Sequence, residues 1–122
     1  MTRSAPLRVL LVSGDLMASS RLAGIGRGAG VEVETLAAPG GMPHGTAFDV
    51  VLIDLQSLPG DPAAHVARAR QLGGATAKVV AFGPHVWKER LDAAISAGAD
   101  DAVSRGAVME SLPDLLARWT GR

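Results

Sequence analysis

One aspartate stands where a sheet could carry out chemistry. Residues 48–55 read FDVVLIDL, so that four apolar residues run unbroken into Asp54. A continuous Val, Leu and Ile run predicts a strand that is buried on both faces of a parallel sheet. Ligands bind at the carboxyl ends of the strands in open α/β sheets, so we expect Asp54 to lie at the functional edge. Its chemistry then depends on the groups that neighbouring strands bring beside it.

The rest of the chain alternates strand and helix patterns that could position those groups. We expect further strands over 7–12, 31–36, 78–82 and 102–104, and helices over 16–29, 62–72, 86–98 and 108–119. Asp15 or Ser13 is expected to cap the first helix, and Asp61 the second. Pro113 predicts a kink in the last helix or a new start near Leu112.

One connection departs from this alternation. Residues 37–47 read AAPGGMPHGTA, with two prolines and three glycines, which predicts a loop or one poor turn in place of a helix. Right-handed crossovers then give a flavodoxin-like, doubly wound five-stranded parallel sheet in the order 2-1-3-4-5, its second helix short or missing. The whole chain, 1–122, is expected to form one domain.

Composition excludes several function classes. Lys and Arg number 12, as do Asp and Glu, so nothing indicates nucleic acid or a membrane surface as an obligatory partner. The absence of cysteine excludes disulfides, thiolate catalysis and Cys-ligated metal sites. No signal-like segment and no unbroken apolar run near ~18 residues is present, so we expect a cytoplasmic protein.

Three separated segments resemble the receiver domain of response regulators, the CheY-like family. They are DVVLIDL with the following Pro59-Gly60, VVAFG at 79–83, and AGADDAVSRGA at 97–107. Together they span nearly the whole chain in the family's order. The resemblance implies that Asp54 occupies the phosphoacceptor position. In that family an acidic pair holds Mg²⁺, and a Ser/Thr and a Lys bind the phosphoryl oxygens.

The positions that match this pocket depart from the family's pattern. Ser13 and Gly14 replace the acidic pair, and Gly83 carries no hydroxyl. We therefore interpret the chain as a degenerate pseudo-receiver that is not an enzyme and that needs no metal or cofactor. Asp54 is expected to pair with Arg105 or to cap a loop. The pocket equivalents are Ser13, Gly14, Asp15, Gly83 and Arg105.

The leading hypothesis is a stand-alone, phosphorylation-independent module that acts by binding a protein. The resemblance implies a sensor kinase or an output protein as the partner. It also implies docking, or a homodimer, through the last two helices and the final strand. On that face Trp87, Arg90 and Leu91 are the candidate contact residues.

Two alternatives stay open. In the first, Asp15 and Asp54 hold a weak Mg²⁺ and the chain is a poorly phosphorylated receiver. In the second, the Gly/Pro loop around 42–45 lies over the strand ends and binds a small ligand. Residues 24–29 match G-x-G-x-x-A, but they end a helix before a strand, which is the wrong context for a dinucleotide site.

Overall fold

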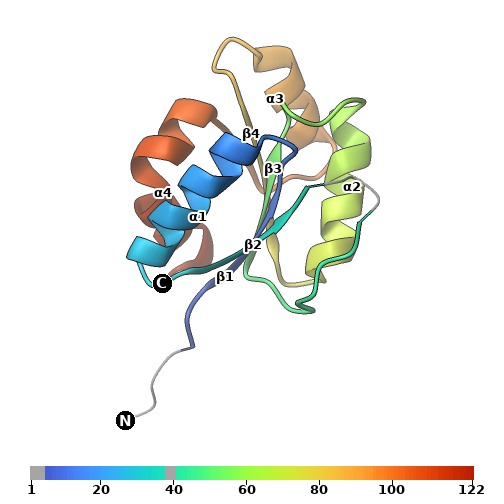
Figure 1. Cartoon of the computed structure of the whole chain (residues 1–122). Helices are drawn as coiled ribbons and strands as arrows, with labels where there is room; N and C mark the ends of the chain where they lie inside the picture. Colours follow the sequence, from blue (N-terminus) through green and yellow to red (C-terminus); the bar gives the residue numbers. More distant parts are fainter. Residues whose placement is uncertain (1–4, 38–40) are drawn as a thin grey trace.

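The computed structural model describes residues 5–37 and 41–122. One parallel sheet has the strand order β2-β1-β3-β4-β5, which confirms the predicted topology (Figure 1). Its strands are β1 Arg8–Val12, β2 Glu32–Leu36, β3 Val50–Asp54, β4 Lys78–Gly83 and β5 Asp101–Ser104. The helices of the described residues are α1 Leu16–Gly28, α2 Pro62–Gly73, α3 Lys88–Ser96 and α4 Arg105–Thr120. None of these helices is long and apolar enough to cross a membrane.

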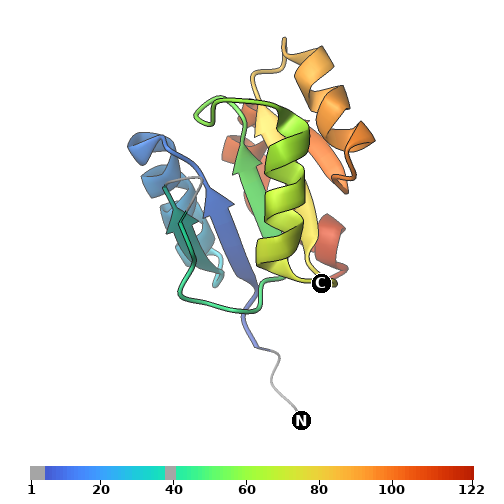
Figure 2. The ribbon, with the colours of Figure 1, turned by 90° about the vertical axis from the view of Figure 1, so that its right-hand side faces the viewer.

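The central strand β3 is buried on both sides because helices cover both faces of the sheet. Val51 and Ile53 pack in the core layer beneath α2 and α3, whereas Val50 and Leu52 pack beneath α1 and α4. Figure 2 shows the two helical layers on opposite sides of the sheet. This alternation follows from the period of two along a strand. Every residue of the apolar run in β3 is therefore buried in one of the two core layers.

The connection between β2 and β3 contains no helix in its described residues, 41–49. The loop predicted over 37–47 is confirmed for 41–47, while 38–40 lie outside the described residues. On the α2 side, Arg68 donates a hydrogen bond of 3.1 Å to the Gly41 carbonyl. A side chain of α2 therefore fixes the loop that stands in the place of the missing helix.

Glu34 of the edge strand β2 fixes the same loop from the other side. Its carboxylate accepts hydrogen bonds from the backbone N–H groups of His44, at 2.6 Å, and Gly45, at 2.9 Å. Burial raises the pKa of Glu34, but the hydrogen bonds from Gly45 and His44 together outweigh it and hold the pKa below its usual value. Gly45 also lies against Arg8, at the amino end of β1.

Both expected helix caps are present. Asp15 accepts a hydrogen bond of 3.0 Å from the N–H of Ala18, and Asp61 accepts one of 3.0 Å from that of Ala63. Each carboxylate satisfies an N–H group that has no partner within the helix. Asp15 is therefore a helix cap, as predicted.

Helix α4 has the predicted kink but not the predicted start. Ser111 has φ −135° and ψ 25°, outside helical geometry, two residues before Pro113. Pro113 has no N–H to donate to the carbonyl four residues earlier, and its ring clashes with that carbonyl, which accounts for the break. The prediction of a start at 108 was wrong, because the helix begins at Arg105 with Ser104 as its cap.

Two further predictions from periodicity were wrong. Helix α3 begins at Lys88, two residues after the predicted start at 86, and Val86 is 71% exposed. Helix α1 buries Ala18 and Leu22, but it ends at Gly28, so that Ala29, the predicted last residue, lies beyond the helix and is exposed. Glycines near the end of α1 weaken its last turns, which accounts for the earlier end.

A side-chain clamp that the sequence reading missed joins α2 to β4 and β5. Asp100 Oδ2 accepts hydrogen bonds from the N–H of Val79, at 2.8 Å, and from Arg70, at 3.1 Å. Arg70 also donates to the carbonyls of Ala77 and Gly98. Burial raises the pKa of Asp100. The hydrogen bond from the Val79 N–H and the contacts with Arg70 together outweigh this effect and hold the pKa below its usual value.

Candidate functional site

Asp54 closes β3 at the carboxyl edge of the sheet, where the sequence predicted it. Its side chain is 0% exposed. The hydroxyl of Ser13 donates a 2.8 Å hydrogen bond to Oδ2, and the N–H of Gln56 donates one of 3.2 Å to Oδ1. Each carboxylate oxygen thus has a donor from the protein, as a buried carboxylate requires.

The strand register explains why Ser13 reaches Asp54. Val12 of β1 is paired with Ile53 of β3, so the next residue of each strand lies side by side. Ser57 adds to the same cluster: its hydroxyl accepts a 2.9 Å hydrogen bond from the N–H of Gly14 and lies 3.4 Å from that of Ser13. The hydroxyls of Ser13 and Ser57 therefore lie together beside the buried carboxylate.

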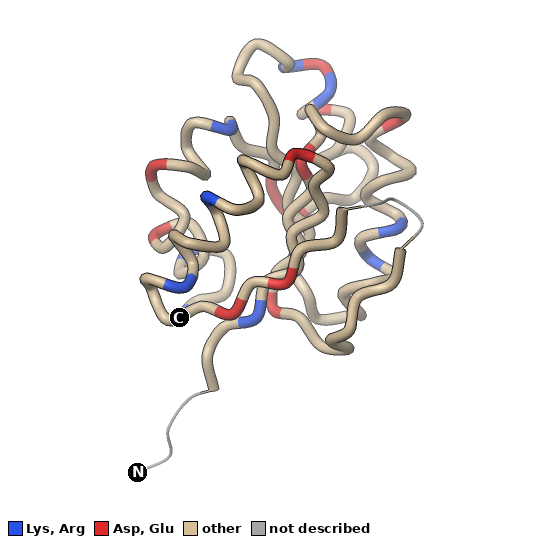
Figure 3. The backbone as a smooth tube through the Cα atoms, in the orientation of Figure 1, with Lys and Arg blue, Asp and Glu red and all other residues tan. Residues whose placement is uncertain are grey.

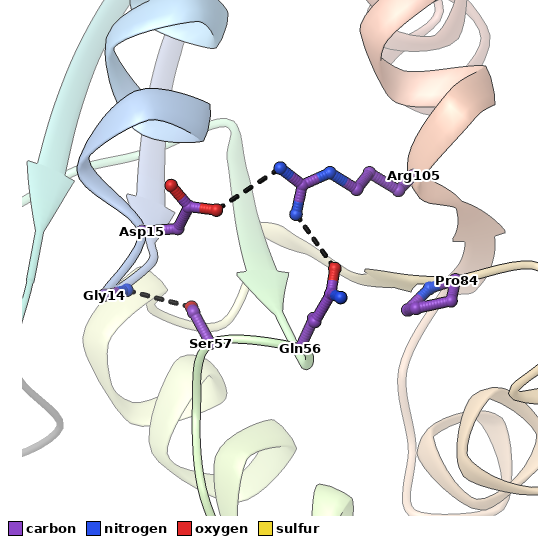
Figure 4. A pocket seen from close by; sticks show the side chains of 6 residues that line it. All are labelled: Gly14, Asp15, Gln56, Ser57, Pro84 and Arg105. Atoms are coloured by element: carbon purple, nitrogen blue, oxygen red, sulfur yellow. Dashed lines mark hydrogen bonds and ion pairs between the residues drawn. The ribbon is translucent and has the colours of Figure 1, made fainter.

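An open hollow lies beside these residues at the carboxyl edge of the sheet. Its volume is about 710 Å³, and Asp54 does not line it. Figure 4 shows side chains from the β1, β3, β4 and β5 ends of the sheet facing into it. The lining residues are Gly14, Asp15, Gln56, Ser57, Pro84 and Arg105.

An arginine bridge crosses the hollow. The guanidinium of Arg105 lies 3.3 Å from Asp15 Oδ2 and donates a 3.0 Å hydrogen bond to Gln56 Oε1 (Figure 4). The hydrogen bond from the Ala18 N–H, and after it Arg105, holds the pKa of Asp15 below its usual value. The expected pairing of Arg105 with Asp54 was wrong, because Arg105 pairs with Asp15. Asp54 binds the N–H of its own loop, which was the other expectation.

Gly83 ends β4 beside the hollow and is buried. A Cβ atom placed there would lie 3.6 Å from the ring of Trp87 and 3.8 Å from Cβ of Leu55, which are ordinary contacts. A Cβ atom therefore fits at this position without rearrangement. Gly83 itself brings no hydroxyl to the site.

The donor set does not fit a magnesium ion. Mg²⁺ takes oxygen ligands in an octahedron and is usually held by one or two carboxylates together with water. Here the Asp54 oxygens are buried and hydrogen-bonded, and Asp15 is committed to a helix cap and to Arg105. The described residues hold no group of three or more His, Cys, Asp or Glu arranged for a metal ion.

The loop expected to bind a small ligand lies elsewhere. Gly45 contacts Arg8 at the amino end of β1, and the loop is held along β2 by Glu34. The hollow lies at the opposite, carboxyl edge of the sheet. The expectation that 42–45 cover the strand ends was therefore wrong.

The three predicted contact residues lie together at the start of α3. Arg90 stacks its guanidinium 5.3 Å from the ring centre of Trp87 and donates a 3.2 Å hydrogen bond to the Gly60 carbonyl. Trp87 and Leu91 are partly buried against the core. Much of their surface is thus used within the chain, and their outer edges remain exposed.

Comparisons with known proteins place the fold. No family model matches the sequence. No curated protein matches it either. A two-component response regulator from Clostridium difficile superposes with a TM-score of 0.76 at 15% identity, covering 95% of this chain and 97% of that one. The Vibrio cholerae chemotaxis protein CheY4 gives 0.74 at 21% identity, covering 93% and 98%.

A third solved structure, described as a pilus assembly protein (cpaE) from Burkholderia thailandensis, gives a TM-score of 0.66 at 22% identity. It covers 95% of this chain and 99% of its own. At these identities the similarity shows a shared fold. The chain has the CheY-like fold of response-regulator receiver domains.

Proposed function

We propose that this chain, built on the receiver fold, is a two-component signalling module that binds a protein partner without being phosphorylated. The observation that supports the proposal is the burial of Asp54, whose carboxylate is 0% exposed and hydrogen-bonded to Ser13. A phosphodonor must reach the acceptor oxygen in line with its leaving group. The burial of the Asp54 carboxylate and its hydrogen bond from Ser13 weigh against that approach.

The electrostatics of the hollow support the same proposal. Transfer of a phosphoryl group to a carboxylate needs a cation between the two negative groups, and in this fold that cation is Mg²⁺. Ser13 and Gly14 offer no carboxylate for it, and Asp15 is already neutralised by Arg105. Arg105 is also less available for phosphoryl oxygens, because Gln56 and Asp15 hold its guanidinium.

The partner in this proposal is a sensor kinase or an output protein. Trp87, Arg90 and Leu91, on the face of the last two helices and the final strand, are the proposed contact residues. The Arg90–Trp87 stack sets a planar cation beside an aromatic ring, and both residue types are enriched at protein interfaces. Exposed Val86 extends this surface with an apolar side chain.

The test is a phosphorylation assay read by intact mass. The protein is incubated with Mg²⁺ and acetyl phosphate, beside an Asp54→Asn variant and a receiver known to accept phosphate from acetyl phosphate. We expect an adduct on the control receiver and none on this chain. An adduct that disappears in Asp54→Asn would overturn the proposal and favour the weakly phosphorylated alternative. Calorimetry with Mg²⁺ alone gives a second reading, because that alternative requires measurable binding.

A further inference from the structure

The edge strand β2 carries backbone groups that point away from the sheet. In its ladder with β1, the N–H of Glu32 donates a hydrogen bond of 2.9 Å to the Leu7 carbonyl. Successive residues of a strand turn their backbone groups to opposite sides, so Glu34 also faces β1, whereas Val33 and Thr35 face outward. Within the described part of the chain, no hydrogen bond reaches the outward N–H and C=O groups of these two residues.

The surroundings of β2 leave this edge accessible. Figure 1 looks onto it, and β2 lies between α1 and the loop of 41–49 with no element drawn in front of it. Helix α1 packs closely on one face, since a Cβ at Gly26 would lie 2.6 Å from Val33 Cγ2. The loop lies on the other face, where Glu34 holds it. Between them Thr35 is exposed, and an exposed edge of this kind is a template for a further strand.

Two carboxylates line the same edge. Glu32 and Glu34 alternate with the outward-facing residues, so their side chains share the α2 side of the sheet with Leu36. Figure 3 shows acidic positions along β2 in red. The side chain of Glu32 is 64% exposed and lies 3.5 Å from Arg8, while Glu34 lies 3.5 Å from His44. One permanent cation, Arg8, thus stands beside two carboxylates among the described residues of this edge.

We infer that β2 binds an extended basic segment of another protein as an added antiparallel strand. Antiparallel pairing is the more stable per residue. In that orientation Val33 and Thr35 exchange backbone hydrogen bonds with the segment. The residues opposite Glu32 and Glu34 form the non-hydrogen-bonded pairs, in which side chains come closest. Lysine or arginine at those two alternate positions pairs with the glutamates, so that charge selects the segment and the backbone holds it.

The same glutamates argue against a second copy of this chain on the edge. An antiparallel pair of two β2 strands would bring Glu32 and Glu34 of both copies to one face of a continuous sheet. Like charges that stand opposite each other destabilise such a pair, and charged side chains commonly protect edge strands from self-association. The edge is therefore closed to its own copy and open to a basic strand.

This inference goes beyond the proposed function and is independent of it. Strands β2 and β5 are the opposite edges of the sheet. The Trp87 surface lies at the start of α3, which packs against β4 and β5. Neither Trp87 nor Asp54 takes part in the β2 edge, so each proposal can fail without the other.

The test is a nitrogen-15 NMR titration of the full chain with synthetic peptides. The probe is a capped peptide of roughly six residues in which lysine alternates with valine. We expect saturable shifts centred on the amides of Val33 and Thr35, and slower hydrogen exchange at both. A peptide with glutamate in place of each lysine should bind at least about threefold more weakly or not at all. So should a peptide with proline in place of each valine, which keeps the charge but lacks the N–H groups that pair with β2.

Charge reversal at Glu32 tests the choice of partner. Glu32→Lys should weaken binding of the lysine peptide at least about threefold and strengthen binding of the glutamate peptide. Glu89→Lys, at an exposed position of α3, changes the net charge equally and should bind the lysine peptide as the unmodified chain does. The amide spectrum itself shows that each variant is folded.

Several results would overturn the inference. They are the absence of saturable shifts on β2 at millimolar lysine peptide, equal binding of the glutamate or proline peptide, and unchanged binding of the lysine peptide by Glu32→Lys. A chain that sediments as a dimer and protects the Val33 and Thr35 amides without any peptide would place a second copy on the edge, which also contradicts it.

Discussion

The hydroxyl of Ser13 lies 2.8 Å from Oδ2 of Asp54, at the point where β1 and β3 end side by side. The contact joins a residue that replaces a carboxylate to the carboxylate that remains. In the receiver family the Ser13 position helps to hold a cation. Here it supplies a hydrogen-bond donor to the Asp54 carboxylate.

Removal of this hydroxyl should destabilise the fold. Ser13→Ala leaves a buried carboxylate oxygen without its donor, and the free energy of unfolding should fall by about 1–3 kcal/mol. Urea unfolding measures the change. Ser20→Ala, on the exposed side of α1, is the matched control and should change it by less than about 0.5 kcal/mol. Equal effects for the two variants would show that the hydrogen bond contributes nothing.

Acid should weaken the fold through Asp100 in particular. Its pKa is lower when folded than when unfolded, so its stabilising effect is complete above the unfolded pKa, about 3.9, and is lost as pH falls through the folded value. Asp100→Asn should therefore be less stable than the unmodified chain at pH 7. The difference between the two should shrink as pH falls toward 3. Urea unfolding across this range measures both, and a difference independent of pH would contradict the assignment.

Loss of the arginine bridge should change the titration of Asp15. Arg105→Gln removes the second cause of the low pKa of Asp15 and leaves the first, the hydrogen bond from the Ala18 N–H. The pKa should rise but stay below its usual value. Carbon-13 NMR of the side-chain carboxyl group follows this directly. An unchanged pKa would mean that Arg105 and Asp15 do not pair in solution.

Two buried glycines should respond differently to alanine. At Gly73 a Cβ would lie 2.7 Å from Val51 Cγ2 and 2.8 Å from Ala77 Cβ, too close without rearrangement. Gly73→Ala should cost about 1–3 kcal/mol, as overpacking does. Gly83→Ala meets only ordinary contacts and should cost less than about 1 kcal/mol. Thermal unfolding ranks the two, and the reverse order would contradict the packing described.

The sheet could be predicted because its signals are local. Unbroken apolar runs predict the buried strands, and Asp15 and Asp61 are typical N-cap residues that predict the helices after them. The Gly/Pro content of 37–47 also predicted the lack of a helix in the part of that segment that the structure describes. Chain connectivity and crossover handedness then left one favoured strand order.

Side-chain pairing could not be predicted in the same way. Arg105 has Asp15, Gln56 and Asp54 within the same region, and the sequence does not say which oxygen its guanidinium reaches. Arg105 pairs with Asp15 and not with Asp54 because Asp54 is buried. That burial depends on the register of β1 and β3, which the sequence alone does not give. The role of Asp100 was missed for the same reason. Its partners, Arg70 and Val79, are distant in the chain and meet only after folding.

The junction between β5 and α4 has a mechanical consequence. The strand ends at Ser104 and the helix begins at Arg105, so no loop residue lies between them to absorb motion. The kink at Ser111 makes the first turns of α4 a short rigid lever. One end of this lever carries Arg105, over the hollow, and the other carries Glu110, on the outer face. A tilt imposed at the outer face would therefore pull directly on the bridge between Arg105 and Asp15.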